Sequence, residues 1–227
     1  MSERPSATDD GLFVAGTGTG VGKTVVTAGI IGWLREAGID ARAIKPVQTG
    51  LPDDDAGVVA DVCGDTESAI CLDRLEPALA PRVAAQRTGR DLEYETILGD
   101  CRAVAADAEF AAVEGIGGLR VPLAGEREVI DLAADLGVPA LVVARSGLGT
   151  LNHTALSVDA LRDRGLSVRG VVLNEYEGAT VAERTNPEEL ERMLDVPVVT
   201  LPRLSGPNAA PEAIRETVAK SILSIDQ

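Results

Sequence analysis

Residues 16–24 read Gly16-Thr-Gly-Thr-Gly-Val-Gly22-Lys23-Thr24, and this stretch decides the fold of the chain. A short apolar stretch, Leu12–Ala15, comes before it, and a helical pattern follows over residues 25–37. Glycines that let backbone N–H groups turn inward, a helix N-terminus, a lysine and a hydroxyl group together bind nucleotide phosphates and Mg2+. All four features stand in this stretch in the required order, which predicts a phosphate-binding loop between a strand and a helix.

The glycine spacing departs from the common G-x-x-x-x-G-K-[ST] pattern by one residue. Counted back from Gly22, the first glycine position holds Thr17, and Gly16 lies one residue further away, so the loop is longer by one. The dinucleotide pattern G-x-G-x-x-G does not fit, because its third glycine would fall on Val21 or Lys23. A glycine-rich β-turn rarely carries Gly-Lys-Thr between a strand and a helix. The loop therefore predicts a nucleoside triphosphate site.

Short β-branched stretches alternate with helical patterns along the whole chain. Several stretches are apolar throughout, which is typical of strands that are buried on both faces of a parallel sheet. The pattern predicts a single-domain α/β P-loop fold, a mainly parallel sheet flanked by helices on both faces. Strands are expected at Leu12–Ala15, Ala41–Val47, Phe110–Val113, Ala140–Arg145, Val168–Leu173 and Val196–Leu201. Helices are expected at about residues 23–37, 93–107, 126–136, 151–164, 187–194 and 210–223.

The length of 227 residues suits one domain. Residues 1–10 are polar and are expected to be disordered, with the domain spanning residues 11–227. Within the domain, residues 48–91 form the least regular stretch, which is expected to be a functional insertion on the substrate side. No apolar run approaches the roughly 20 residues of a membrane span, and the N-terminus resembles no leader peptide, so a cytoplasmic location is expected.

The net charge of −15 argues against a nucleic-acid or anionic-membrane partner, because phosphate groups must be met by clustered basic residues. Lysine is scarce. Of the three lysines, Lys23 falls in the phosphate loop, Lys45 in a second motif that follows a predicted strand, and Lys220 near the C-terminus. The three cysteines are widely spaced, so they predict neither a disulfide framework nor a zinc site.

Two further motifs follow predicted strands, at the edge where ligands of open α/β sheets bind. The first is Lys45-Pro-Val-Gln-Thr49-Gly, in which Lys45 is expected to face the same phosphates as Lys23. The second is Glu114-Gly-Ile-Gly-Gly118. Glu114 resembles the acidic residue that helps to hold Mg2+ in P-loop proteins, and the later glycines let backbone N–H groups approach an anion.

A third motif, Gly147-Leu-Gly149-Thr150-Leu-Asn152-His153, follows another buried strand and opens a helix. Its N–H groups form a second candidate anion site, suited to a carboxylate. His153 is the single histidine, and it is expected to have a structural or hydrogen-bonding role. Asn174 ends a predicted strand, and its amide can donate and accept at once, as an adenine edge demands.

Taken together, the motifs GTGTGVGKT, KPVQTG, EGIGGLRVPL, GLGTLNH and VVLN resemble those of the dethiobiotin synthetases in order and spacing, over nearly the whole chain. The resemblance implies a ligase that binds ATP and Mg2+ and closes a ureido ring on 7,8-diaminononanoate with CO2, giving dethiobiotin, ADP and phosphate. It also implies a homodimer, in which the diamine lies between the ATP of one subunit and the GLGTLNH helix of the other.

The resemblance carries roles onto matching positions. Lys23 and Lys45 would neutralise the charge that passes from a carbamate to the phosphoryl group. Mg2+ would be held by Thr24, Asp55 and Glu114, with Asp54 and Asp61 as alternatives to Asp55. The diamine and carbamate would contact Thr19, Thr49, Gly118, Gly149, Thr150 and Asn152. The nucleotide would contact Gly20, Val21, Gly22, Lys23, Thr24, Val25, Asp55, Glu114, Gly115, Ile116, Gly117, Asn174, Glu175, Pro202, Arg203 and Leu204.

A regulatory ATPase of the ParA/MinD type is the alternative function on the same fold. Such proteins use a signature lysine early in the loop, and no lysine lies between Gly16 and Gly22. An amidoligase of the cobyrinate-synthase type would bring a glutaminase domain, for which 227 residues leave no room. Within the resemblance itself, Gly20 stands where some relatives carry an acidic residue, and the positions after Leu204 match poorly.

Overall fold

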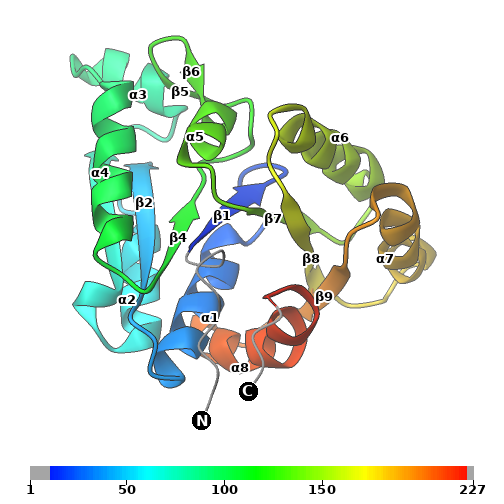
Figure 1. The fold of residues 1–227 in the computed structure, drawn as a ribbon. Helices are drawn as coiled ribbons and strands as arrows, with labels where there is room; N and C mark the ends of the chain where they lie inside the picture. The colour runs from blue at the N-terminus through cyan, green and yellow to red at the C-terminus, as the bar shows by residue number, and fades with distance from the viewer. Residues whose placement is uncertain (1–10, 224–227) are drawn as a thin grey trace.

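A seven-stranded parallel sheet forms the centre of the computed structural model, which describes residues 11–223 (Figure 1). The strand order is β3-β2-β4-β1-β7-β8-β9. The six predicted strands are all present. The predicted disordered segment, residues 1–10, lies outside the described range. The strands are β1 (Gly11–Gly16), β2 (Ala41–Thr49), β3 (Ala69–Leu75), β4 (Phe110–Glu114), β7 (Ala140–Arg145), β8 (Val168–Tyr176) and β9 (Val198–Pro202).

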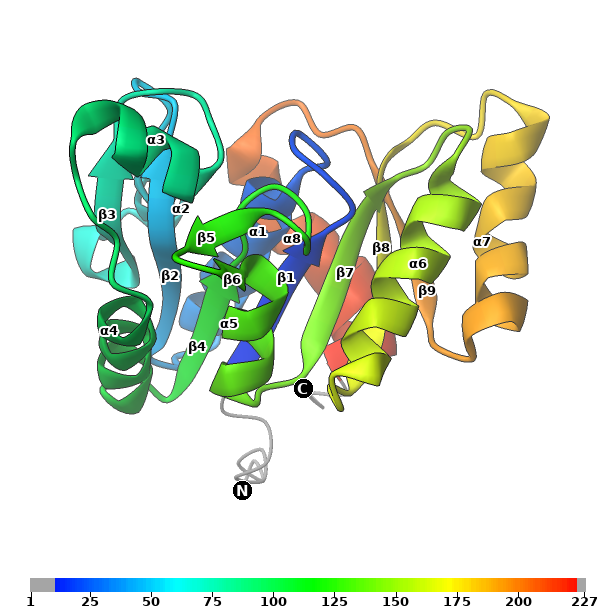
Figure 2. The same cartoon turned by 90° about the horizontal axis from the view of Figure 1, so that it is seen from above.

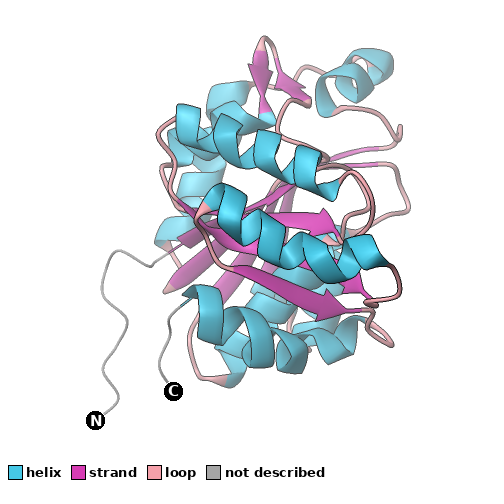
Figure 3. Cartoon of the chain, turned by 90° about the vertical axis from the view of Figure 1, so that its right-hand side faces the viewer, coloured by secondary structure: helices cyan, strands magenta, loops and turns pink. Residues whose placement is uncertain are grey.

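Helices cover both faces of the sheet, as the alternating pattern predicts (Figures 1 and 3). One face carries α1 (Lys23–Glu36), α2 (Asp55–Cys63), α8 (Ala210–Ile214) and the π-helical η3 (Arg215–Leu223). The other carries α3 (Pro81–Thr88), α4 (Tyr94–Ala106), α5 (Val129–Leu136), α6 (Thr150–Asp163) and α7 (Val181–Leu194). A two-stranded hairpin, β5 (Pro122–Ala124) with β6 (Arg127–Glu128), precedes α5. In the described part of the chain, no helix is both long and apolar enough for a membrane crossing.

Alternate residues of the central strands serve two apolar cores. In β1, Phe13 and Ala15 belong to the core that includes α4, α5, α6 and α7. Leu12 and Val14 belong to the core that includes α1, α8 and η3. All four side chains are at most 2% exposed. Both faces of the strand are buried, which explains why its sequence is apolar without interruption.

Two helices begin later or earlier than the sequence pattern predicts. α7 begins at Val181 and not near residue 187, because Thr180 and Glu183 form a capping box that starts the helix there. α5 begins at Val129 and not near residue 126, because the residues just before it pair as β6 of the hairpin. The helix predicted over residues 210–223 is divided into α8 and η3.

The irregular segment at residues 48–91 contains α2, β3 and α3, and no strand was predicted there. β3 lies at the edge of the sheet and pairs with β2 alone. Its sequence, AICLDRL, mixes polar and apolar residues, and Ile70 is 41% exposed. An edge strand is covered less than a central one, so β3 lacks the continuous apolar run that identifies the other strands.

The carboxyl ends of the strands lie along one edge of the sheet, where the loop after β1 stands between the ends of β4 and β7 (Figure 2). Ligands of open α/β sheets bind at this edge. The motifs that follow β1, β4 and β7 therefore meet there, together with the β2 lysine.

Candidate active site

The phosphate loop joins β1 to α1 and packs tightly against β8. Gly22, the residue before α1, has a φ of 100°, a left-handed conformation that favours glycine. A Cβ atom at Gly22 would lie 1.9 Å from Asn174 Nδ2, so the close approach of β8 also requires glycine there. The ammonium of Lys23 donates hydrogen bonds to the carbonyl oxygens of Gly18 (3.1 Å) and Gly117 (3.0 Å). The Lys23 ammonium thereby connects the phosphate loop to the loop that follows β4.

Lys23 is buried and lies near a second lysine and two carboxylates. Only 7% of the Lys23 residue is exposed to solvent. Burial, and then the ammonium group of Lys45, lower the pKa of Lys23 to about 8, against the smaller opposing effect of Glu114 and Asp55. An anionic ligand beside Lys23 would offset the burial and the repulsion by Lys45 that lower this pKa, so the site favours a ligand such as a phosphate.

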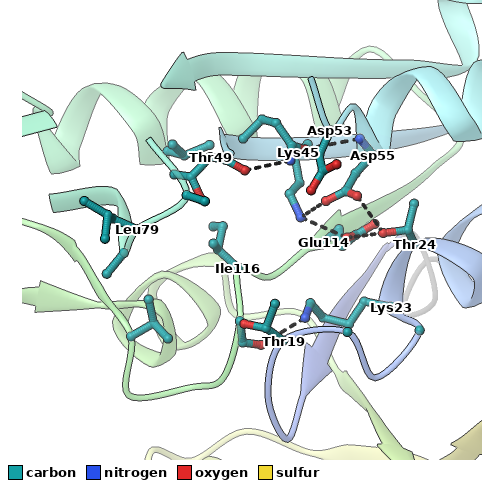
Figure 4. A pocket seen from close by; sticks show the side chains of 18 of the residues that line it. Thr19, Lys23, Thr24, Lys45, Thr49, Asp53, Asp55, Leu79, Glu114 and Ile116 are labelled. Atoms are coloured by element: carbon teal, nitrogen blue, oxygen red, sulfur yellow. Dashed lines mark hydrogen bonds and ion pairs between the residues drawn. The ribbon is translucent and has the colours of Figure 1, made fainter. Parts of the chain in front are cut away.

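Three oxygen-bearing side chains converge near the Lys45 ammonium (Figure 4). The Thr24 hydroxyl lies 2.9 Å from Asp55 Oδ1 and 3.0 Å from Glu114 Oε1, and its single hydrogen is donated to one of them at a time. Thr24 lies in the first turn of α1, Asp55 begins α2 and Glu114 ends β4, so three separate elements supply this group. Hydroxyl and carboxylate oxygens are the donors that Mg2+ prefers, and the set therefore fits that ion.

Lys45 joins the two carboxylates. Its Nζ lies 2.5 Å from Asp55 Oδ2 and 2.9 Å from Glu114 Oε1, and the residue is 5% exposed. Burial alone would lower the pKa of Lys45, but the two carboxylates outweigh burial and raise it. For Asp55 the signs are opposite: burial would raise the pKa of this carboxyl, but Lys45 outweighs burial and the pKa is lowered. β2 continues as far as Thr49, so Lys45 lies inside the strand and is a buried cation rather than an edge charge.

Asp55 is the member of its acidic run that reaches the loop. Asp54 instead caps α2 by accepting the Gly57 N–H at 3.0 Å, and it pairs with Arg74 at 2.8 Å. Asp61 is exposed on α2. Gln48, for which the sequence predicts no role, is buried and accepts the Asp55 N–H at 3.2 Å. The start of α2 is thus fixed to β2, with Asp55 aimed at Thr24 and Lys45.

A cavity of about 600 Å³ opens in front of these groups. It brings the two lysines together with Thr19 and Thr49, the residues predicted to orient the substrate (Figure 4). The predicted residues that line it are Thr19, Gly20, Gly22, Lys23, Thr24, Val25, Lys45, Thr49, Asp55, Glu114, Ile116 and Gly117. Lining residues that were not predicted are Val47, Gln48, Asp53, Ala78, Leu79, Ala80 and Val121. Their one sequence signal is that most of them fall in or beside the irregular segment at residues 48–91.

A second cavity, of about 530 Å³, borders the loop beside β7 and β8. There the amide of Asn174 donates to the Val21 carbonyl oxygen at 3.1 Å. Arg145, at the end of β7, donates to the Gly20 carbonyl oxygen from Nη2 at 2.8 Å and from Nε at 3.2 Å. Sequence reasoning missed Arg145, because an arginine at the end of a strand has no distinctive pattern. The predicted residues that line this cavity are Thr19, Val21, Thr150, Asn174, Glu175 and Arg203.

Six predicted residues line neither cavity. Gly149 and Asn152 lie at the start of α6, so within one chain they do not share the cavity of Lys45. Gly118 forms an isolated antiparallel bridge with Thr17, which holds the loop after β4 against the phosphate loop. The other three are Gly115, Pro202 and Leu204.

Comparison with known proteins identifies the family of this chain. The sequence model of the AAA domain family matches residues 10–206. The ATP-dependent dethiobiotin synthetase BioD of Haloferax mediterranei is 59% identical over 193 residues, which cover 85% of this chain and 83% of that protein. The protein of the same name from Aquifex aeolicus is 34% identical over 215 residues, covering 94% and 97%. The chain belongs to the ATP-dependent dethiobiotin synthetase family.

Solved structures show that this chain shares its fold with P-loop ATPases. The cell division ATPase MinD of Pyrococcus furiosus aligns with a TM-score of 0.58 at 17% identity, covering 95% of this chain and 96% of that one. A ParA family ATPase of Chlorobium tepidum aligns with a TM-score of 0.57 at 12% identity, covering 96% and 98%. At such identities the likeness shows the fold alone. The ParA/MinD type is thus a distant structural relative of this member of the dethiobiotin synthetase family.

Proposed function

We propose that this protein makes dethiobiotin from 7,8-diaminononanoate, CO2 and ATP, with ADP and phosphate as the other products. The observation that carries the proposal is the meeting of Lys23 and Lys45 in one cavity beside the Asp55 and Glu114 carboxylates. Charge passes from a carbamate to a phosphoryl group in this reaction, and fixed cations stabilise such a transfer. Membership of the family supports the choice of substrates.

The proposed reaction has three steps. One amine of the diamine adds to CO2 and loses a proton, which gives a carbamate. A carbamate oxygen attacks the γ-phosphorus and ADP leaves. The second amine then attacks the carboxyl carbon and loses a proton, and phosphate leaves as the ring closes. Lys23 and Lys45 would neutralise the anionic oxygens, while Thr19 and Thr49 would orient the diamine and its carbamate.

The Thr24, Asp55 and Glu114 oxygens would hold Mg2+, which when bound supplies a counter-charge for the β and γ phosphates. Their mutual distances of 2.9 and 3.0 Å around the Thr24 hydroxyl support this assignment. The N–H groups of Gly20 to Val25 would bind the phosphates, with Gly115, Ile116 and Gly117 facing them. The base would lie near Asn174, Glu175, Pro202, Arg203 and Leu204.

The wall that faces the phosphate loop would bind the substrate. Thr49, Asp55 and residues 78–80 all line the main cavity, and all belong to the irregular segment at residues 48–91. This placement supports the segment as a substrate-side insertion within a single domain. The net charge of −15 supports an enzyme without a nucleic-acid or membrane partner.

We also propose a homodimer with the active site at its interface. Gly149, Thr150 and Asn152 would bind the carboxylate of the diamine, yet within one chain none of the three lines the Lys45 cavity. A second copy would supply them. Two apolar side chains beside this turn are exposed, Leu148 at 93% and Leu156 at 61%, as expected of a surface that a partner covers.

Mixing two inactive variants tests the shared site. Lys45→Gln disables one half of the site and Asn152→Asp, which places a negative charge at the carboxylate subsite, disables the other. If the site lies between subunits, random mixed dimers regain one intact site each, or about a quarter of all sites in an equal mixture. If no activity returns on mixing, the interface site is wrong.

The activity itself is tested by supplying the diamine, bicarbonate, Mg2+ and ATP, and measuring dethiobiotin and ADP together. We expect one ADP for each dethiobiotin, and no ADP release without the diamine. ATP turnover that ignores the diamine would favour the ParA/MinD type of function instead. Lys220→Gln, which changes an exposed lysine that lines neither cavity, is the matched control for lysine variants.

A further inference from the structure

Side chains of two neighbouring strands donate hydrogen bonds to two successive carbonyl groups of the phosphate loop. Arg145, the last residue of β7, and Asn174, which lies near the carboxyl end of β8, are register partners. Arg145 donates twice to the Gly20 carbonyl oxygen, at 2.8 and 3.2 Å, and Asn174 donates to the Val21 carbonyl oxygen at 3.1 Å. The contacts join residues that are 125 and 153 positions apart in the sequence, so they exist only in the folded chain.

The direction of these carbonyl groups sets the direction of the next two N–H groups. In a trans peptide the C=O and the following N–H point to opposite sides. With the carbonyls of Gly20 and Val21 held by β7 and β8, the N–H groups of Val21 and Gly22 point away from those strands. Gly20 and Gly22 line the main cavity, and inward N–H groups are what a phosphate loop uses to bind an anion.

The backbone of the phosphate loop is flexible enough to require contacts from outside the loop. Gly20 has a φ of 69° and is exposed, and Gly22 has a φ of 100°, so the loop contains two residues with unusual backbone freedom. A side chain at position 20 would be in van der Waals contact with the guanidinium, because a Cβ atom there would lie 3.4 Å from Arg145 Nη2. In this chain the guanidinium binds the backbone oxygen directly.

Arg145 also differs from the ion-paired arginines of the surface. Arg90, Arg164 and Arg192 each pair with an aspartate or glutamate. Within residues 11–223 the structure gives Arg145 no carboxylate partner, although the chain is strongly acidic. Its two hydrogen-bonding nitrogens are aimed at a single loop carbonyl instead.

We propose that Arg145 is a positioning residue of the phosphate loop. Together with Asn174 it fixes two successive peptide groups, so that the Val21 and Gly22 N–H groups face the cavity before the nucleotide arrives. Preorganised donors bind an anion without a further ordering cost. The inference rests on the part of the proposed function that puts nucleotide phosphates in this cavity, and it does not depend on which reaction follows.

Three variants distinguish the effect of the Arg145 hydrogen bonds to the loop from the effect of its positive charge. Arg145→Lys keeps the charge but loses the two-nitrogen grip, and Arg145→Met loses both. Arg184→Met is the matched control, because Arg184 is an exposed arginine that donates to the Gly178 carbonyl oxygen at 2.8 Å, on a turn outside the loop. Each protein is assayed for binding of a fluorescent ADP analogue with Mg2+, and for amide hydrogen exchange of residues 17–23 without ligand.

We expect both Arg145 variants to bind the analogue about tenfold more weakly, and to exchange the loop amides several times faster, than the parent protein. The KM for ATP should rise while kcat at saturating ATP stays within about twofold, and the melting temperature should not move because Arg145 is exposed. Arg184→Met should change none of these.

Parental affinity in Arg145→Lys together with weak binding in Arg145→Met would overturn the inference, since charge alone would then explain the effect. Unchanged loop exchange in both variants would overturn it as well. If the parent protein fails to bind the analogue, the proposed function is wrong, and the exchange measurement still decides whether Arg145 holds the loop.

Discussion

The Lys45 ammonium lies 2.5 Å from the Asp55 carboxylate and 2.9 Å from that of Glu114, so one buried cation pairs with two carboxylates, which begin α2 and end β4. The Thr24 hydroxyl contacts the same two carboxylates from α1. Ion pairs and hydrogen bonds therefore connect α1, α2 and β4 to Lys45 or to its two carboxylates. A substitution of Lys45 should change both the catalytic rate and the free energy of unfolding.

Lys45→Gln should lower kcat far more than it weakens ATP binding. Glutamine keeps a hydrogen-bond donor but removes the charge that stabilises the transferring group, and such a loss costs on the order of 100-fold to 1000-fold in kcat. The measurement is the steady-state rate of dethiobiotin formation at varied ATP, with Lys220→Gln as control. A defect confined to the KM for ATP would contradict a catalytic role for Lys45.

Lys45→Met should make the stability of the protein depend on divalent cations. Removal of Lys45 leaves two largely buried carboxylates without a counter-charge, and breaking a buried pair in this way costs about 3 kcal/mol. Mg2+ or Mn2+ at the same oxygens would restore part of that loss. Thermal unfolding at increasing Mg2+, together with free Mn2+ counted by electron paramagnetic resonance, should show a larger response in the variant than in the parent.

An equal response of both proteins to the metal would mean that Lys45 and the cation do not compete for Asp55 and Glu114. Asp55→Asn in the Lys45→Met background is the matched control for that measurement. It removes one of the proposed ligands, and the added metal response should then fall.

Gly22→Ala should abolish tight nucleotide binding. A Cβ atom there would overlap Asn174 Nδ2 at 1.9 Å, and the φ of 100° is strained for alanine, at about 1–3 kcal/mol. Gly18→Ala is the control in the same loop, because a Cβ at Gly18 has no atom within 4 Å. Binding of the fluorescent ADP analogue should drop at least about tenfold for the first variant, in line with the strain of such backbones, and little for the second. Equal effects of the two would refute the steric argument.

Asp131→Asn should remove part of the acid sensitivity of folding. Asp131 accepts the Glu128 N–H at 2.7 Å in the capping box of α5 and pairs with Arg164. Burial would raise the pKa of Asp131, but the Glu128 N–H and Arg164 outweigh burial and lower it. A carboxyl with a lowered folded pKa stabilises fully above its unfolded pKa of about 3.9, and the contribution is lost as pH falls through the folded value.

Urea unfolding at pH 6, 5, 4 and 3 measures this contribution. The free energy of unfolding of the parent should exceed that of Asp131→Asn by about 1 kcal/mol at pH 6, and the two should approach each other in acid. Asp159→Asn, at an exposed position of α6, is the control. A constant difference across this pH range would show that the lost interaction does not depend on the charge of Asp131.

Several elements of the site could be predicted because local sequence specifies them. Gly16 to Thr24 must form a loop between a strand and a helix, and the apolar runs of β1 and β7 can be buried only inside a sheet. Glu114 follows such a run directly, so the carboxyl end of β4 places it at the ligand edge. Lys45 was predicted at the same edge, and the structure places it deeper, inside β2.

Other elements depend on neighbours that are distant in sequence. β3 is an edge strand of mixed polarity, and pairing with β2 defines it more than its own composition does. Asp55, Asp54 and Asp61 remained alternatives in the sequence, and the contacts of Thr24 and Lys45 distinguish Asp55 from the other two.

The sequence alone determined most of the strands and helices, the phosphate loop and the family, because periodicity, glycine placement and motif spacing are local properties of the chain. Only the tertiary structure decided that Lys45 bridges Asp55 and Glu114, and that Arg145 holds the Gly20 carbonyl. Most of those contacts join residues that lie far apart along the chain. They arise when parallel strands bring their carboxyl ends to one edge of the sheet, which no local pattern encodes.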